Sequence, residues 1–306
     1  MPVPVLPTFV GALTLSNVYA GIGYAWVRHL TMWAATVIIL LYLIKIVRFP
    51  QACRKEYDTV VPCSLYAGFT MVLMILGSYY YDYVPAFGRG IFLAAVFIHA
   101  VHILVFTCRN VIKKREINTF VPSWYVTYNG IMVSCVVGGA MQAQPILKVV
   151  LYYGIIIYFV ILPFMLWRLI TVEVKPPVYH TMAVLLAPCS LCVVSYLNVE
   201  KNPNQVLLYL LYICVLASFV FILTRLPKFF SFSFTPGFAG MTFPMCIGIV
   251  ATDKMSGYFA AAGNEMLAAW TGQLKGIQIY LTTMIVGYVL LRFLMMALRT
   301  DQTQKS

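Results

Sequence analysis

Two pairs of side chains have the spacing of a metal or redox site. His99 and His102 are three residues apart, and Cys189 and Cys192 form a CxxC sequence, so each pair would share one face of a helix. A haem or metal site in a membrane helix needs matching ligands on a second helix, and the sequence offers neither pair such a partner. Buried cysteine usually behaves as a small hydrophobe. We therefore expect packing residues here, with no metal and no cofactor.

Acidic residues are absent from the segments expected to span a membrane. All nine are expected in loops or tails: Glu56, Asp58, Asp82, Glu116, Glu173, Glu200, Asp253, Glu265 and Asp301. Cation pores commonly carry rings of Asp or Glu, and proton-coupled carriers need an ionisable relay. The absence of a carboxylate at the bilayer midplane argues against both classes.

Uncharged polar groups remain as the candidates for contacting a solute. Hydroxyls, amides and helix termini in a positively charged protein can favour anions. On alternate spans these groups belong to Thr14, Ser16, Asn17, Ser64, Thr70, Asn129, Ser134, Ser190, Ser195 and Thr242. Hydrogen bonding between helices explains any one of them equally well.

The composition indicates an integral membrane protein. Hydrophobic residues make up 62% of the 306 residues and charged residues only 10%, whereas soluble domains carry about a quarter charged residues. Crossing a bilayer takes roughly 20 helical residues. The sequence therefore predicts one all-α domain, residues 1–306, with ten membrane spans arranged as five helical hairpins. We place the spans near residues 7–26, 30–47, 60–80, 88–108, 120–141, 146–169, 178–197, 205–224, 234–252 and 276–298.

Alternate spans differ at their midpoints. The odd-numbered spans have a helix-weakening residue near the centre, in order Asn17, Gly68, Gly130, Pro188 and Pro244. The centres of the second, fourth, sixth and eighth spans are Ile38, Phe97, Phe159 and Val215. Glycine and proline at membrane depth are tolerated where freed backbone groups face protein or a water-filled cavity. The pattern predicts a pore lined by the odd spans and enclosed by the even ones.

The basic residues predict the orientation. Of 21 Lys and Arg residues, fifteen fall in the loops and tails on one side, and the other side holds Arg28, Arg89, Lys148, Lys201, Lys254 and Lys275. Cytoplasmic loops carry the excess of Lys and Arg, so both termini are expected in the cytoplasm. The same asymmetry accounts for the net charge of +12 without nucleic acid as a partner.

Several stretches, in this order and spacing, resemble the tellurite-resistance/dicarboxylate transporter family, which includes bacterial TehA and the plant slow anion channels. The resemblance covers nearly the whole chain. Its clearest parts are Gly11 to Arg28, Ile46 to Val61, Val121-Pro122, Leu186-Ala187-Pro188 and Thr242 to Thr252.

The resemblance implies a homotrimer in which each protomer has its own pore, lined by five odd helices in a quasi-fivefold arrangement. It also implies a phenylalanine gate on the ninth helix, and Phe243 matches that position; an ordinary core aromatic is the alternative. Gly68 and Phe69 stand where many relatives have a proline, so the third helix is expected to bend less. The expected pore-lining residues are Thr14, Asn17, Gly68, Phe69, Asn129, Gly130, Ser134, Pro188, Ser190, Thr242 and Pro244.

We expect a plasma-membrane channel for small monovalent anions such as chloride and nitrate, and no enzyme. A C4-dicarboxylate, tellurite or sulfite transporter of the same family is the first alternative, and a membrane-embedded enzyme is a remote one, because no catalytic constellation is visible. A dicarboxylate carrier would be expected to place Arg or Lys at the midplane. No odd span has one, which favours the channel.

Overall fold

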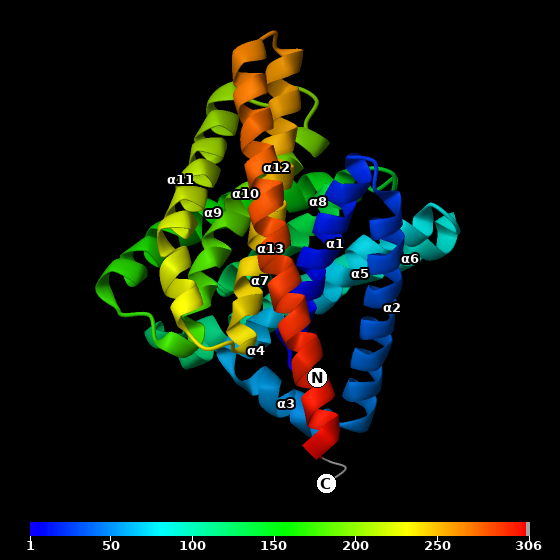
Figure 1. Cartoon of the computed structure of the whole chain (residues 1–306), viewed down its shortest axis with the longest axis vertical. Helices are drawn as coiled ribbons and strands as arrows, with labels where there is room; N and C mark the ends of the chain where they lie inside the picture. The colour runs from blue at the N-terminus through cyan, green and yellow to red at the C-terminus, as the bar shows by residue number, and fades with distance from the viewer. Residues whose placement is uncertain (304–306) are drawn as a thin grey trace.

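The structure is a computed structural model that describes residues 1–303 and the side chains of residues 1–298. Every regular element in that range is helical (Figure 1). Five long helices match the even-numbered spans: α2 (Ala25–Arg48), α6 (Pro85–Phe106), α9 (Gln144–Thr171), α11 (Gln205–Ser231) and α13 (Glu265–Thr303). A π-helical segment, η1 (Thr107–Lys114), extends α6, and α3 (Pro50–Asp58) and η2 (Ile117–Thr119) lie in connections.

Most of the odd-numbered spans are divided. α1 (Val5–Gly21) is one helix, but the others change helix type along their length. They consist of α4 (Val60–Leu65) with α5 (Ala67–Tyr81), α7 (Trp124–Tyr128) with η3 (Gly130–Met132) and α8 (Val133–Val137), η4 (Pro176–Leu185) with α10 (Leu186–Val199), and η5 (Pro236–Met241) with α12 (Thr242–Ala261). Gly130 lies at one such break. Pro188 and Pro244, the helix-weakening residues near the centres of their spans, lie in the first turn of α10 and α12, where proline is tolerated.

Within residues 1–303, seven helical spans are long and apolar enough to cross a membrane, judged by length and composition, and α1 is a shorter apolar helix of 17 residues. The segments at 124–137 and 236–261 fall outside those limits, so the count of ten spans stays a prediction. In the part of the chain that the structure describes, each of the ten expected ranges nevertheless contains a helical segment. The fold is an all-helical membrane bundle, as the composition predicts.

Burial separates the two sets of helices. In the spans Val60–Tyr81 and Pro176–Val199, both odd-numbered, 67% and 78% of the most apolar window is buried inside the protein. The five even-numbered spans have between 22% and 39% of that window buried. The exposed faces of the even helices are rich in large apolar side chains, such as Val47, Ile170 and Val206. The odd helices therefore form the interior, and the even helices present apolar surface that suits lipid.

The last two helices are longer than predicted. α12 and α13 run side by side and extend beyond the other helices at the top of the view in Figure 1, and the turn between them has Gly263 at a φ of +75°. Asp253, expected in a loop, lies within α12, and Glu265 begins α13. Glu56 and Asp58 likewise belong to α3. A span predicted from hydropathy ends where charged residues begin. The helix itself can continue beyond that point, because its backbone hydrogen bonds also form outside the membrane.

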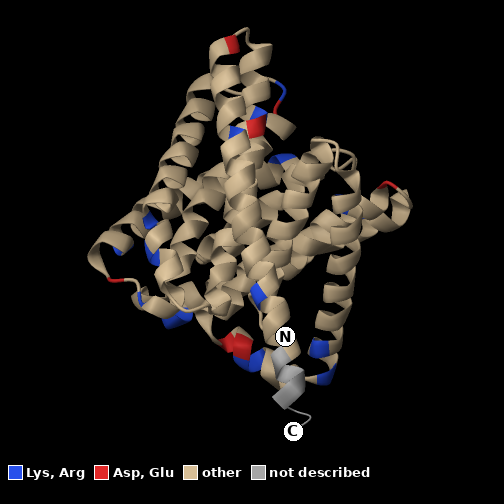
Figure 2. Cartoon of the chain, viewed as in Figure 1, with Lys and Arg blue, Asp and Glu red and all other residues tan. Residues whose placement is uncertain are grey.

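Charge is distributed unevenly over the two ends of the bundle. Most Lys and Arg residues lie along the lower and left sides of the view in Figure 2, and the centre of the bundle is largely uncharged. The N-terminus and the C-terminal end of α13 lie at the same end of the molecule (Figure 1). Lys45 donates a hydrogen bond from Nζ to the backbone oxygen of Met1 at 2.9 Å, which holds the N-terminus at the end of α2. The side chains of Arg299 and Lys305, both assigned to the basic side, lie outside the described residues.

Candidate functional site

Two cavities inside the bundle meet at Phe243. The larger, which we call the wide vestibule, has a volume of about 260 Å³ and lies toward Asp253 and Lys275. The smaller, which we call the narrow cavity, has a volume of about 20 Å³ and lies toward Pro7 and Gly240. Phe243 is the one residue that lines both, and its side chain is 5% exposed. Phe243 therefore lies between the two spaces.

The narrow cavity has lining residues from all five odd-numbered spans. They come from α1, α4, α5, α7, η3, η4, α10, η5 and α12, and none comes from an even-numbered span. The lining is composed of apolar side chains and backbone, with Tyr125 as its one residue that carries a side-chain hydroxyl. A space of about 20 Å³ is close to the minimum for a single water molecule. The interior is therefore almost completely filled at this level.

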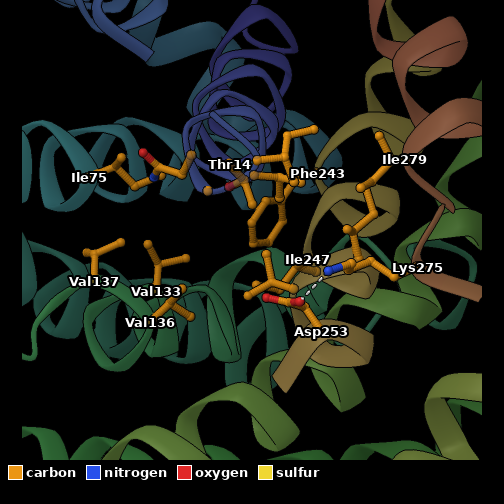
Figure 3. A pocket seen from close by; sticks show the side chains of 16 residues that line it. Thr14, Ile75, Val133, Val136, Val137, Phe243, Ile247, Asp253, Lys275 and Ile279 are labelled. Atoms are coloured by element: carbon orange, nitrogen blue, oxygen red, sulfur yellow. Dashed lines mark hydrogen bonds and ion pairs between the residues drawn. The ribbon is translucent and has the colours of Figure 1, made fainter. Parts of the chain in front are cut away.

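The wide vestibule combines an apolar wall with a few polar groups. The wall is largely β-branched: Val18, Ile75, Val133, Val136, Val137, Ile247, Ile249, Val250 and Ile279. In Figure 3 the Phe243 ring lies close to Thr14 and Ile247, across the space from Val133 and Val137. The charged residues in the lining are Asp253 and Lys275, joined by a bond of 2.8 Å from Nζ to Oδ1. Because the Asp253 side chain is 56% exposed, the vestibule reaches the surface there.

Contacts between α1 and α12 hold Phe243 in place. Thr242, the residue before it, donates from Oγ1 to the backbone oxygens of Ala239 at 2.8 Å and Pro7 at 3.4 Å. Gly11 of α1 faces the same turn, where an added Cβ would lie 2.9 Å from the backbone carbon of Thr242. Glycine is required at Gly11 because the two backbones approach so closely. The position of the ring is therefore set by helix packing as well as by its own contacts.

A hydrogen-bonded chain fixes Asn17 at the rim of the wide vestibule. Arg28 donates from Nε to Asn17 Oδ1 at 3.1 Å and from Nη2 to Asp82 Oδ2 at 3.1 Å. Because a guanidinium only donates, the amide oxygen of Asn17 must face Arg28. Among the described residues, the amide nitrogen of Asn17 has no hydrogen-bond acceptor.

Part of the predicted pore lining contacts these cavities. Thr14 and Asn17 line the wide vestibule, Gly130 and Pro244 line the narrow cavity, and Phe243 lines both. The remaining predicted lining residues lie outside the lining of both spaces, and they are Gly68, Phe69, Asn129, Ser134, Pro188, Ser190 and Thr242.

Local packing explains these other placements. Asn129 donates from Nδ2 to the backbone oxygen of Gly154 in α9 at 2.9 Å, so its amide faces the outer helices. Ser134 donates to the oxygen of Ile131 in its own segment at 2.7 Å. The ring of Phe69 packs on Tyr42 of α2. Asn129 therefore makes a hydrogen bond between helices, which was the alternative to contact with a solute.

Gly68, Pro188 and Ser190 also face protein. An added Cβ at Gly68 would lie 3.0 Å from the backbone nitrogen of Pro7, which places Gly68 against α1. Pro188 and Ser190 are buried in α10. The hydroxyl of Ser190 has no hydrogen-bond partner among the described residues.

The histidine pair of α6 joins several helices. The Nε2 of His99 donates to the backbone oxygen of Thr127 at 2.9 Å, and in the neutral ring Nδ1 then accepts from Oγ1 of Thr70 at 2.7 Å. The Nδ1 of His102 lies 2.7 Å from the hydroxyl of Tyr57, whose pKa is raised above its usual value by burial. Both rings therefore use their nitrogens to cross-link α3, α5, α6 and α7.

Two features of the site are absent from the residues that the sequence pattern predicts. The first is the β-branched wall of the wide vestibule. The second is the pair Asp253 and Lys275, which were assigned to a loop although α12 and α13 carry them to the cavity. Asp253 lies on the same helix face as Phe243, because positions 243, 247, 250 and 253 are three or four residues apart along α12. This spacing is the sequence signal that could have identified Asp253.

Together these features form two cavities in a largely apolar helical interior, separated by one aromatic ring. The walls of both cavities beside the ring are mostly apolar and offer few hydrogen-bonding groups. A family model for the voltage-dependent anion channel matches residues 4–300. No curated protein matches the chain.

Proposed function

The chain belongs to the voltage-dependent anion channel family, and we propose that it is a channel for small monovalent anions, such as chloride and nitrate, whose pore is closed by Phe243. The match over residues 4–300 confirms the resemblance seen in the sequence. The family consists of membrane channels and transporters for anions, not enzymes.

The position of Phe243 between the two cavities is the observation that carries the proposal. The narrow cavity has lining from all five odd-numbered spans, so it occupies the position expected of a central pore. An aromatic ring at a constriction blocks ions by size and by excluding water, and it needs no charge to do so. The arrangement corresponds to a closed pore that opens when the ring moves.

The charges near the passage favour anions and a channel mechanism. The narrow cavity contains no acidic residue among its lining residues, so nothing there attracts cations. It also contains no Arg or Lys, which a carrier for C4-dicarboxylates, tellurite or sulfite would use to hold its substrate. In a neutral constriction the cost of dehydration dominates the barrier. Weakly hydrated anions should therefore pass at least as well as chloride.

We further propose a homotrimer in the plasma membrane with both termini in the cytoplasm. The trimer follows from the family resemblance, and the exposed apolar faces of α2, α9, α11 and α13 suit contact with lipid or with neighbouring protomers. The orientation follows from the excess of Lys and Arg at the end where both termini lie. In this orientation the wide vestibule opens to the outside.

The proposal is tested with purified protein reconstituted into bilayers. Phe243→Ala should carry a current whose reversal potential in a salt gradient follows the anion, with nitrate and iodide at least as permeant as chloride. The current should need no substrate on the opposite side, whereas a carrier that works by exchange would need one. A reversal potential that follows the cation overturns the proposal. Flux that depends on a dicarboxylate, tellurite or sulfite on the opposite side would favour the carrier.

A further inference from the structure

Lys275 is the single basic residue among the described residues that line the two cavities. It lies on α13, which was expected to be an outer helix. The rest of the vestibule wall is formed by odd-numbered spans and the turn after α1, but Lys275 and Ile279 belong to α13, which is an even-numbered span. At the level of the wide vestibule, α13 therefore contributes to the interior.

The packing of α13 explains how Lys275 reaches the vestibule. Lys275, Ile279 and Thr283 follow at intervals of four residues, so they share one face of the helix. Thr283 lies at the far end of this face, with its Oγ1 2.9 Å from the hydroxyl of Tyr19 in α1. Ile279 packs on the cluster that α1, α12 and α13 form around Leu15. This face of α13 is consequently fixed against α1 and α12 and points Lys275 into the space between them.

The charge of Lys275 is partly offset and still accessible. Its Nζ lies 2.8 Å from Oδ1 of Asp253, and the two side chains are 30% and 56% exposed. Figure 3 shows the pair at the edge of the vestibule, beside Ile247 and within the same space as Phe243. A single carboxylate occupies at most part of the donor capacity of an ammonium group, which has three hydrogens.

A second donor is positioned in the same vestibule. The amide oxygen of Asn17 is held by Arg28, so the amide nitrogen keeps its hydrogens for another acceptor. Lys275 and Asn17 both line the cavity on the Asp253 side of Phe243. Lys275 and Asn17 thus place two side-chain donors in the wide vestibule before the ring, whereas the lining of the narrow cavity has only the hydroxyl of Tyr125.

We propose that Lys275 is the anion-capturing residue of the wide vestibule and that Asp253 limits its strength. The ligand is a small, hydrated inorganic anion, which gathers near Lys275 and Asn17 before it passes Phe243. A conducting site must bind well enough to attract the ion and weakly enough to release it. Asp253 keeps the binding weak enough for release, because its carboxylate competes with the anion for the ammonium group of Lys275. This inference rests on the proposed channel function and names the residue that governs access to it.

Unitary conductance of charge-neutralised variants tests this role, with Phe243→Ala as the conducting parent. In about 0.1 M salt, Lys275→Gln should lower anion conductance and Asp253→Asn should raise it, each by about 1.5- to 2.5-fold, as expected for one charge roughly 8 Å from the ion in water-rich surroundings. The double variant should return close to the parent, because the two effects have opposite signs. Lys275→Arg keeps the charge and should keep the conductance. In about 1 M salt the differences should nearly vanish, since the Debye length falls to about 3 Å.

Lys254→Gln is the matched control. Lys254 is exposed on α12 beside Asp253, but it does not line the vestibule, so its neutralisation should leave the conductance unchanged. An equal loss in Lys254→Gln and Lys275→Gln would refute the inference, because a general surface charge would then explain both. A loss in both Lys275→Gln and Asp253→Asn would also refute it, because a structural ion pair predicts the same sign for both.

The measurements distinguish a failure of the channel function from a failure of the capture role of Lys275. If the parent carries no anion current, the channel function is refuted, and this inference with it. If anion current is present and Asp253→Asn does not raise it, the capture role alone is refuted. Asp253→Asn retains the lysine, so this arm decides the question even where Lys275→Gln fails to fold.

Discussion

Gly11 and Phe243 touch through their backbones: a Cβ added to Gly11 would lie 2.7 Å from the backbone nitrogen of Phe243. The two residues are on α1 and α12, far apart in the sequence, and Phe243 lies between the two cavities. A contact this short leaves no room for a side chain. The position of the ring thus depends on the absence of a side chain in α1.

Gly11→Ala should lower stability and increase anion flux through the resting protein. The added methyl group must push α12 away, which commonly costs about 1–3 kcal/mol in a packed interior, and the shifted ring should close the passage less tightly. Thermal unfolding in detergent and flux into liposomes measure the two effects. Gly257→Ala is the control, because nothing lies within 4 Å of its added Cβ. Unchanged stability and flux in Gly11→Ala would contradict the contact.

Shortening the side chain at Phe243 should raise anion flux in the order Phe, Leu, Ala. The ring lines space on two sides, so its loss should cost about 1–2 kcal/mol, below the ~3–5 kcal/mol that is common for a fully buried phenylalanine.

Phe238→Ala is the comparison for this series. Phe238 is fully buried and its ring centroid lies 3.9 Å from that of His180, so its removal should cost the full amount and open no passage. Unfolding temperature and flux, measured on both variants, separate the two roles. If Phe243→Ala loses as much stability as Phe238→Ala and gains no flux, Phe243 is an ordinary core residue.

Thr70→Val should destabilise the protein by about 1–3 kcal/mol, because it leaves the buried Nδ1 of His99 without its hydrogen-bond partner. Thr31→Val is the matched control, since Thr31 donates only to the oxygen of Val27 in its own helix and should cost about 0.5 kcal/mol or less. Thermal unfolding of the two variants checks the difference. Equal unfolding temperatures would mean that the histidine bond adds nothing to stability.

Composition and local pattern determined the class of this protein and which helices lie inside. A chain with 62% hydrophobic and 10% charged residues can satisfy its backbone in a bilayer only as helices or a closed barrel. The helix-weakening residues at the midpoints, such as Gly130, mark helices that need protein around them, and burial confirms the division. Phe243 was singled out through the family resemblance, because its own neighbours in the sequence do not distinguish a gate from a core aromatic.

The tertiary structure decided which side chains reach the two cavities. Asn129 is polar and on an odd-numbered span, yet its amide donates to the backbone oxygen of Gly154 in α9, because the rotation of a helix about its axis is set by packing against distant segments. The same packing brings Lys275 of α13 into the vestibule and Gly11 against Phe243. These contacts join residues far apart in the chain, and hydropathy and helix periodicity describe only neighbours within one helix.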